Sequence, residues 1–151
     1  MPDAATAVPI GNLIAGATWI ALIASLFVPA LRRTVWPAAR WAVPALFALL
    51  YIPFALIGLG EAEGGGFGSA AEIRALFASD HSLGAGWVHY LAFDLFVGSW
   101  IAELGLRHRV PALLLVPCLI LTFLFGPAGL LLFLLLRLAF RRRGAAPETA
   151  S

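Results

Sequence analysis

Long apolar runs without alternation of polar and apolar residues constrain the fold of this chain more than any other feature. Four such runs occupy about residues 10–31, 41–60, 84–106 and 110–140. A helix needs about twenty apolar residues to cross roughly 30 Å of hydrocarbon, and only helices or closed barrels satisfy their backbone hydrogen bonds in lipid. Because the runs do not alternate, they favour helices. The sequence therefore predicts an all-α integral membrane protein, a bundle of four transmembrane helices.

The composition agrees with this class. Hydrophobic residues make up 62% of the 151 residues, charged residues make up 12%, and the mean hydropathy is +0.94, whereas about a quarter of the residues of soluble domains are charged. All ten basic residues are arginine, and eight acids reduce the net charge to +2. The arginines lie beside apolar runs instead of forming one basic face, so we expect no nucleic-acid partner.

The two ends of the chain bear on its organisation. Asp3 precedes the first apolar run and no basic residue does, which differs from a cleavable signal peptide. We therefore expect a single transmembrane domain over residues 1–143 and a disordered tail over 144–151. The expected setting is a lipid bilayer, with the chain as a multi-pass protein of a bacterial inner membrane. The sequence leaves open whether the protein forms a homo-oligomer.

Two segments between the runs carry local signals. Arginine and tryptophan residues within 32–41 indicate an interface loop between the first two spans. In the polar stretch 61–83, Ser69 and Glu72 fit a capping box, and apolar residues recur at helical spacing from Ile73 onward. This pattern predicts a short interfacial helix between the second and third spans. We interpret it as an amphipathic connector in preference to a functional lid.

The arginines leave the orientation open. If four helices cross the membrane, five arginines lie on each side, and the positive-inside rule makes no choice. If the last run re-enters and returns, nine arginines lie on one side and only Arg74 lies on the other. We favour a single crossing by 110–140, broken at Pro117 and at Gly126-Pro127, because half of this run has only about fifteen residues and is too short to cross.

The third run contains the ionisable residues that fit lipid least. His89, Asp94 and Glu103 lie in or near the membrane, where ionisable residues usually face the bundle interior and serve a function. Asp94 lies near the middle of the run and is the strongest candidate, and the alternative is a carboxyl group that links helices. Arg107 follows Glu103 by four residues, which predicts an interfacial ion pair.

Helical geometry separates the two leading candidates. At about 100° per residue, His89 and Asp94 lie about 140° apart around a helix, so a direct acid–base pair is not expected, although both can border one cavity. Tyr90 precedes Asp94 by four residues, which places its phenol within reach of the carboxyl group. Nearby aromatic residues can line an apolar binding site, although packing is their commoner role. These candidate lining residues are Trp87, Tyr90, Phe93 and Trp100.

Other kinds of site lack their signatures. The three histidines have neither the spacing of a zinc site nor an evident bis-histidine haem arrangement. The glycines from Gly64 to Gly68 lack the lysine and the following helix of a phosphate-binding loop. The single cysteine, Cys118, allows no disulfide within the chain. We therefore expect no metal and no cofactor.

Two motifs resemble those of the neoxanthin synthase family, which is named for abscisic-acid deficiency, and of its bacterial relatives. The likeness extends over about residues 10–140. The first motif has the pattern Trp-(Ile/Val)-His-x-Leu-x-x-Asp-Leu-Phe, and the second surrounds a Gly-Pro pair. The matching residues are Trp87, His89, Leu91, Asp94, Leu95 and Phe96 in the first motif, and Phe125, Pro127 and Gly129 in the second.

The resemblance implies a four-helix membrane protein required to convert violaxanthin into neoxanthin by opening an epoxide and forming an allene. This isomerisation needs an acid and a base but no redox cofactor. We assign Asp94 as the acid and His89 as the base or orienting group of a carotenoid or isoprenoid isomerase, or of a binder. The alternatives are a non-catalytic scaffold or accessory protein for pigment or lipid enzymes and a small proton-coupled transporter.

Overall fold

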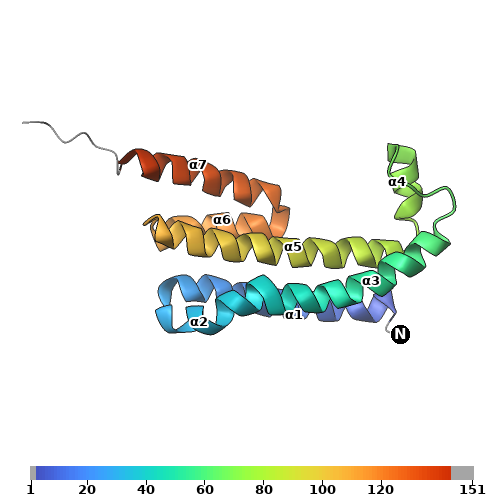
Figure 1. The fold of residues 1–151 in the computed structure, drawn as a ribbon, viewed down its shortest axis with the longest axis horizontal. Coiled ribbons are helices and arrows are strands. Elements are labelled where there is room, and N and C mark those ends of the chain that lie inside the picture. Colours follow the sequence, from blue (N-terminus) through green and yellow to red (C-terminus); the bar gives the residue numbers. More distant parts are fainter. Residues whose placement is uncertain (1–2, 144–151) are drawn as a thin grey trace, which may run out of the picture.

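The structure is a computed structural model that describes residues 3–143, and within this range every regular element is a helix. Figure 1 shows an elongated molecule in which the long helices run side by side. The prediction of an all-helical chain is confirmed. The predicted tail, 144–151, lies outside the described residues.

Among the residues that the structure describes, two elements are long and apolar enough to cross a membrane: Ala4–Phe27, which is helix α1, and the continuous stretch Pro29–Glu61. Asp3 caps α1, because its carboxylate accepts a hydrogen bond from the Thr6 N–H at 2.8 Å. The chain turns at Val28, which is extended, and the next helix starts with a proline, a residue whose fixed φ suits the first helical position. The turn therefore falls inside the predicted first span, 10–31.

The second stretch contains three elements: α2 (Pro29–Pro37), a π-helical turn η1 (Ala38–Ala42) and α3 (Val43–Glu61). The segment predicted as an interface loop, 32–41, is therefore helical, because the apolar helix that follows it extends back through the arginines to Pro29. Helix α2 lies across one end of the molecule, and α3 then runs back along α1 (Figure 1).

The polar stretch folds as the capping box indicates. Helix α4 (Ala70–Leu76) begins at Ser69, whose hydroxyl accepts a hydrogen bond from the Glu72 N–H, and the Glu72 carboxylate accepts one from that hydroxyl. The short helix predicted between the second and third spans is thus present in the structure, at the end of the molecule opposite α2 (Figure 1).

Helix α5 (Asp80–Arg107) lies at the centre of the molecule and contacts α1, η1, α3 and the two last helices. Small residues let its neighbours approach closely. A Cβ atom at Gly98 would lie only 2.3 Å from the Trp19 ring of α1. Leu95 and Ile101 are fully buried in the same core. Because of this central position, α5 contributes residues to every candidate site described below.

The last apolar run forms a hairpin of two helices, α6 (Ala112–Phe125) and α7 (Pro127–Arg143), which pack antiparallel (Figure 1). The expectation of a single broken span over 110–140 is therefore wrong, because the two halves of this run lie side by side. Gly126 has a φ of +37°, in a region that favours glycine, and Pro127 has no N–H to continue the hydrogen bonding of α6. A Cβ atom at Gly129 would lie 2.2 Å from the Thr122 nitrogen, so the two arms touch at backbone distance.

Candidate functional site

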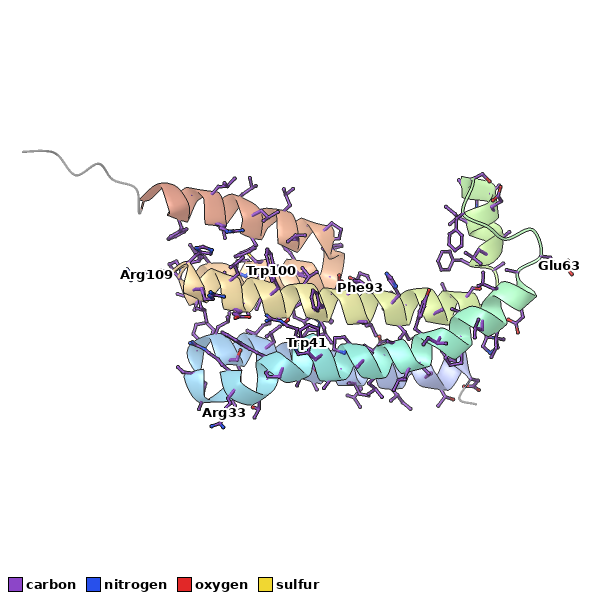
Figure 2. All side chains as sticks on the ribbon, in the orientation of Figure 1. Arg33, Trp41, Glu63, Phe93, Trp100 and Arg109 are labelled. Carbon is purple, nitrogen blue, oxygen red and sulfur yellow. The ribbon has the colours of Figure 1, made fainter. Side chains whose placement is uncertain are left out.

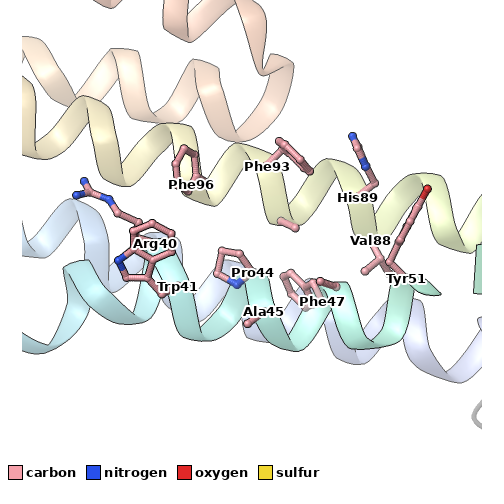
Figure 3. Close-up of a pocket in the computed structure, with 12 residues that line it drawn as sticks. Arg40, Trp41, Pro44, Ala45, Phe47, Tyr51, Val88, His89, Phe93 and Phe96 are labelled. Atoms are coloured by element: carbon pink, nitrogen blue, oxygen red, sulfur yellow. The ribbon is translucent and has the colours of Figure 1, made fainter. Parts of the chain in front are cut away.

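An apolar groove lies between α3 and α5 and has a volume of about 630 Å³. Figure 3 shows Arg40 and Trp41 at one end and Tyr51 and His89 at the other. Phenylalanine and alanine side chains form most of the wall between them. The main apolar lining residues are Phe47, Ala48, Val88, Ala92, Phe93 and Phe96.

A second lobe of about 320 Å³ continues the groove towards α4 and shares Tyr51 and His89 with the first. Phe77, which directly follows α4, and Phe67 line this lobe. Counted along η1 and α3 from Trp41 to Leu59, the two lobes together extend about 27 Å at the helical rise. The groove is therefore long and narrow, and one pair of polar side chains marks the place where its lobes meet.

His89 and Tyr51 form this pair. The His89 ring stacks on Phe93 with 4.4 Å between ring centroids and lies 5.8 Å from the Tyr51 ring. Both stacked rings come from α5 and Tyr51 comes from α3, so the packing of two helices brings the pair together. Sequence reasoning identified His89 and Phe93 but missed Tyr51. The available signal was its position as the one hydroxyl-bearing residue in the apolar run 43–60.

Arg40 closes the other end of the groove but is already paired. Its Nε donates to the Ser99 hydroxyl at 3.1 Å, its Nη2 donates to the Ser99 carbonyl at 3.0 Å, and its Nη1 pairs with Glu103 at 2.5 Å. The predicted pair of Glu103 and Arg107 is present at 3.8 Å, with Arg107 largely exposed. Arg40 therefore joins η1 to α5, and its charge is balanced within the protein.

Asp94 lies outside the groove lining, beside the turn of the α6–α7 hairpin. A Cβ atom at Gly126 would lie 2.9 Å from its Oδ1 atom. The Tyr90 hydroxyl lies against the Asp94 carboxyl group and donates a hydrogen bond to the Phe123 carbonyl at 3.0 Å. The other carboxyl oxygen, Oδ2, is buried and has no hydrogen-bond partner within the described part of the chain. The two sequence motifs thus meet at the tip of the hairpin.

The structure separates the other predicted site residues. The Trp87 indole donates to the Asn12 side chain at 2.7 Å and so joins α5 to α1. The Trp100 ring packs edge-on against Phe133 of α7 with 5.6 Å between centroids. Of the predicted lining residues, Phe93 is therefore the one in the groove with His89. Asp94 and His89 do not border one cavity, because they lie on different faces of α5.

No three His, Cys, Asp or Glu side chains among the described residues come close enough to hold a metal ion. A separate polar cluster lies at the α4 end, where the Glu61 carboxylate contacts the His81 ring at 3.0 Å and accepts a hydrogen bond from the Ser79 hydroxyl. This cluster joins the end of α3 to the start of α5.

The fold and the groove define a class of protein: helical, with two helices that meet the length and apolarity of membrane spans, and with an elongated apolar groove between two of its helices. Such grooves suit ligands that are mostly apolar and carry few polar groups. The chain belongs to the ABA DEFICIENT 4-like family, whose model matches residues 7–133. This confirms the resemblance drawn from the two motifs and relates the chain to neoxanthin synthase. No curated protein and no solved structure matches it.

Proposed function

We propose that this protein is embedded in a membrane, binds a carotenoid or related isoprenoid in the groove between α3 and α5, and isomerises its oxygenated end ring. The observation that carries the proposal is the groove itself, which is apolar along most of its length and polar where Tyr51 and His89 meet. A long polyene matches the larger lobe, and one end ring matches the smaller lobe beside α4.

The outer surface supports the membrane setting. Large aliphatic side chains point outward on separate helices, with exposed fractions of 74% for Leu13, 71% for Leu49 and 74% for Leu113. Transferring each of these side chains from water into lipid is favourable by about 1.5–3 kcal/mol. A bilayer turns this exposed apolar surface into a stabilising contact, and a ligand dissolved in the bilayer reaches the groove from the side.

The chemistry that we propose needs two proton transfers. Opening the epoxide breaks a carbon–oxygen bond and adds a proton to the oxygen, and forming the allene removes a proton from carbon, so that no atoms or electrons are gained. An imidazole ring nitrogen can accept a proton as a general base, which suits His89, because its ring lines the groove. We assign the Tyr51 hydroxyl, which lines the groove, as the group that hydrogen-bonds the epoxide oxygen and donates the proton to it. In this proposal Asp94 positions Tyr90 and the hairpin, because it lies outside the groove lining.

A binding experiment tests the groove. The protein is expressed in a carotenoid-producing host and purified in mild detergent. The pigment extracted from the purified protein is then identified by absorbance and mass. Ala48→Trp, which fills the groove, should remove the pigment, whereas Ala17→Trp on exposed α1 surface should retain it. Equal pigment in both variants would show that the ligand binds elsewhere or only adventitiously.

A turnover experiment tests the chemistry. Purified protein in lipid nanodiscs is supplied with violaxanthin, and neoxanthin is quantified by chromatography. Removing an acid–base group costs about 10²–10⁴-fold in rate, so His89→Ala and Tyr51→Phe should lose conversion while retaining pigment. Asp94→Asn should keep conversion in molecules that stay folded. If Asp94→Asn folds and binds pigment but does not convert it, the acid is Asp94. If the unmodified protein binds pigment but converts none of it, the isomerase proposal is wrong and the protein only binds a carotenoid.

A further inference from the structure

Apart from Asp94, which lies near the middle of α5, the acidic and basic residues within the described range are divided between the two ends of the molecule. Figure 2 places Arg33 and Arg109 at one end and Glu63 at the other. We call the end formed by α2, η1, the C-terminus of α5 and the C-terminus of α7 the arginine end (Figure 1). Within residues 3–140 it carries every arginine except Arg74, and Glu103 is its one acid in that range. The opposite end carries Asp3, Glu61, Glu63, Glu72 and Asp80.

This division follows from the hairpin. Helix α6 has 14 residues, which is about 21 Å at the helical rise, short of the roughly 30 Å of a hydrocarbon core. Its tip at Gly126 lies against Asp94, near the middle of the 28-residue helix α5. Helix α7 then returns to the arginine end and brings Arg137 with it (Figure 1).

The tip of the α6–α7 hairpin, at Gly126, has the features that a turn in the middle of a bilayer requires. Irregular backbone is tolerated inside a bilayer only where protein buries it and its polar groups are satisfied. Gly126 is buried and its N–H donates to the Thr122 carbonyl at 2.9 Å. The Phe123 carbonyl accepts the Tyr90 hydroxyl. Pro127 contributes no N–H at the position that follows.

We propose that the chain crosses the membrane three times, through α1, α2–η1–α3 and α5, and that α6–α7 is a re-entrant hairpin inserted from the arginine end. This end faces the cytoplasm and lies against the lipid headgroups there, because positively charged loops are retained on that side. Asp3 and α4 face the opposite side. The inference rests on the membrane setting of the proposed function, and not on the ligand or the reaction.

Cysteine labelling in cell membranes tests this topology. Cys118 is fully buried and is replaced by alanine to give a parent without cysteine. Single cysteines are then introduced at exposed positions: Ala71→Cys in α4, Thr34→Cys in α2, Ala139→Cys in α7 and Leu124→Cys beside the tip. Each variant is treated with a membrane-impermeant maleimide in intact spheroplasts and in inverted vesicles.

We expect label at Ala71→Cys in spheroplasts only, and label at Thr34→Cys and Ala139→Cys in inverted vesicles only. Leu124→Cys should stay unlabelled in both until detergent is added. Label at Ala139→Cys from the same side as Ala71→Cys would show a fourth crossing and overturn the hairpin topology. The reverse pattern at all three positions would overturn the orientation.

The failure of the proposed function is distinguishable from a failure of this topology. Absence of bound pigment in purified protein would contradict the ligand proposal and leave the labelling pattern unchanged. Release of the protein from membranes by alkaline carbonate without detergent would overturn the membrane setting itself. The labelling therefore tests only how the chain is threaded.

Discussion

Arg40 illustrates how a single charged side chain is accommodated between apolar helices. The side chains of Arg40 and Glu103 are only 20% and 29% exposed, and the guanidinium also donates two hydrogen bonds to Ser99. Removing one partner of such a pair leaves the other with an uncompensated charge away from water. Arg107 is the second cation near Glu103. Its side chain is 72% exposed, so water screens its attraction to Glu103.

We predict that Glu103→Gln lowers the free energy of unfolding by about 1–2 kcal/mol, since hydrogen bonds to charged groups contribute about 1.5–3 kcal/mol and these side chains are partly solvated. Arg107→Gln is the matched control and should cost less than about 0.5 kcal/mol, as exposed ion pairs do. Thermal unfolding followed by circular dichroism in detergent measures both. Equal losses would show that Arg40 is not the main partner of Glu103.

Asp3 gives a prediction about pH. Hydrogen bonds from Thr6 lower the pKa of the Asp3 carboxyl group below its ordinary value. A carboxyl group with a lowered folded-state pKa stabilises the fold above its unfolded pKa, and this contribution is lost as the pH falls through the folded value. Asp3→Ala should therefore reduce stability at pH 7 by more than it does below about pH 4.

Asp3→Asn serves as the control for this effect, because asparagine also caps helices but does not titrate in this range. Unfolding midpoints at a series of pH values would compare the three proteins. A difference between Asp3→Ala and the natural chain that stays constant with pH would show that the charge of the cap is unimportant.

At the scale of elements, the α6–α7 hairpin is the feature on which the topology depends. Its turn combines a residue with positive φ, a proline without an N–H and a contact with Asp94 of α5. Close packing of the arms at Gly129 and Thr122 holds the two helices together. A change at the tip therefore acts on both the backbone conformation of the turn and its contact with α5.

Gly126→Ala should destabilise the protein by at least about 1–2 kcal/mol, the cost of a left-handed backbone for a residue with a Cβ atom, and the new methyl group would also press on Asp94. Gly16→Ala is the control, because its Cβ atom would meet nothing within 4 Å in the middle of α1. That substitution should stabilise by about 0.5–1 kcal/mol. Thermal unfolding compares the two, and a neutral Gly126→Ala would contradict the described turn.

At the scale of the whole molecule, the division of charge gives the bundle a direction. The helices α1, α3 and α5 connect an acidic end to the arginine end (Figures 1 and 2). Positively charged segments stay on the cytoplasmic side of a membrane. The membrane therefore distinguishes the two ends even though the net charge of the chain is only +2. The orientation therefore depends on where charges lie and not on how many there are.

We predict that adding positive charge to the acidic end inverts part of the population. Ala70→Arg combined with Ala71→Arg, both exposed at the start of α4, should let Thr34→Cys be labelled in spheroplasts as well as in inverted vesicles. The same positions changed to glutamine provide the control and should leave the labelling one-sided. Labelling that is unaffected by the arginines would show that charge does not set the orientation.

Local signals in the sequence predicted local structure well. The Ser69–Glu72 capping box marks the start of α4, and the four-residue spacing of Tyr90 and Asp94 places their side chains together, because both depend only on neighbours within one helical turn. The helical class follows in the same way from the apolar runs. The family was also identifiable from the two motifs.

Contacts between distant segments were decided only by the tertiary structure. The hairpin was not predicted, because the length of the broken apolar run favours a single span over two short arms. In addition, the turn of the hairpin lies against Asp94, which belongs to another helix. Tyr51 joins His89 across α3 and α5, and Arg40 reaches Glu103 across 63 positions of sequence. Apolar periodicity shows that residues avoid water and does not show which neighbours they meet. By itself the sequence determined helices, family and candidate polar residues, whereas helix packing decided which of them share a site.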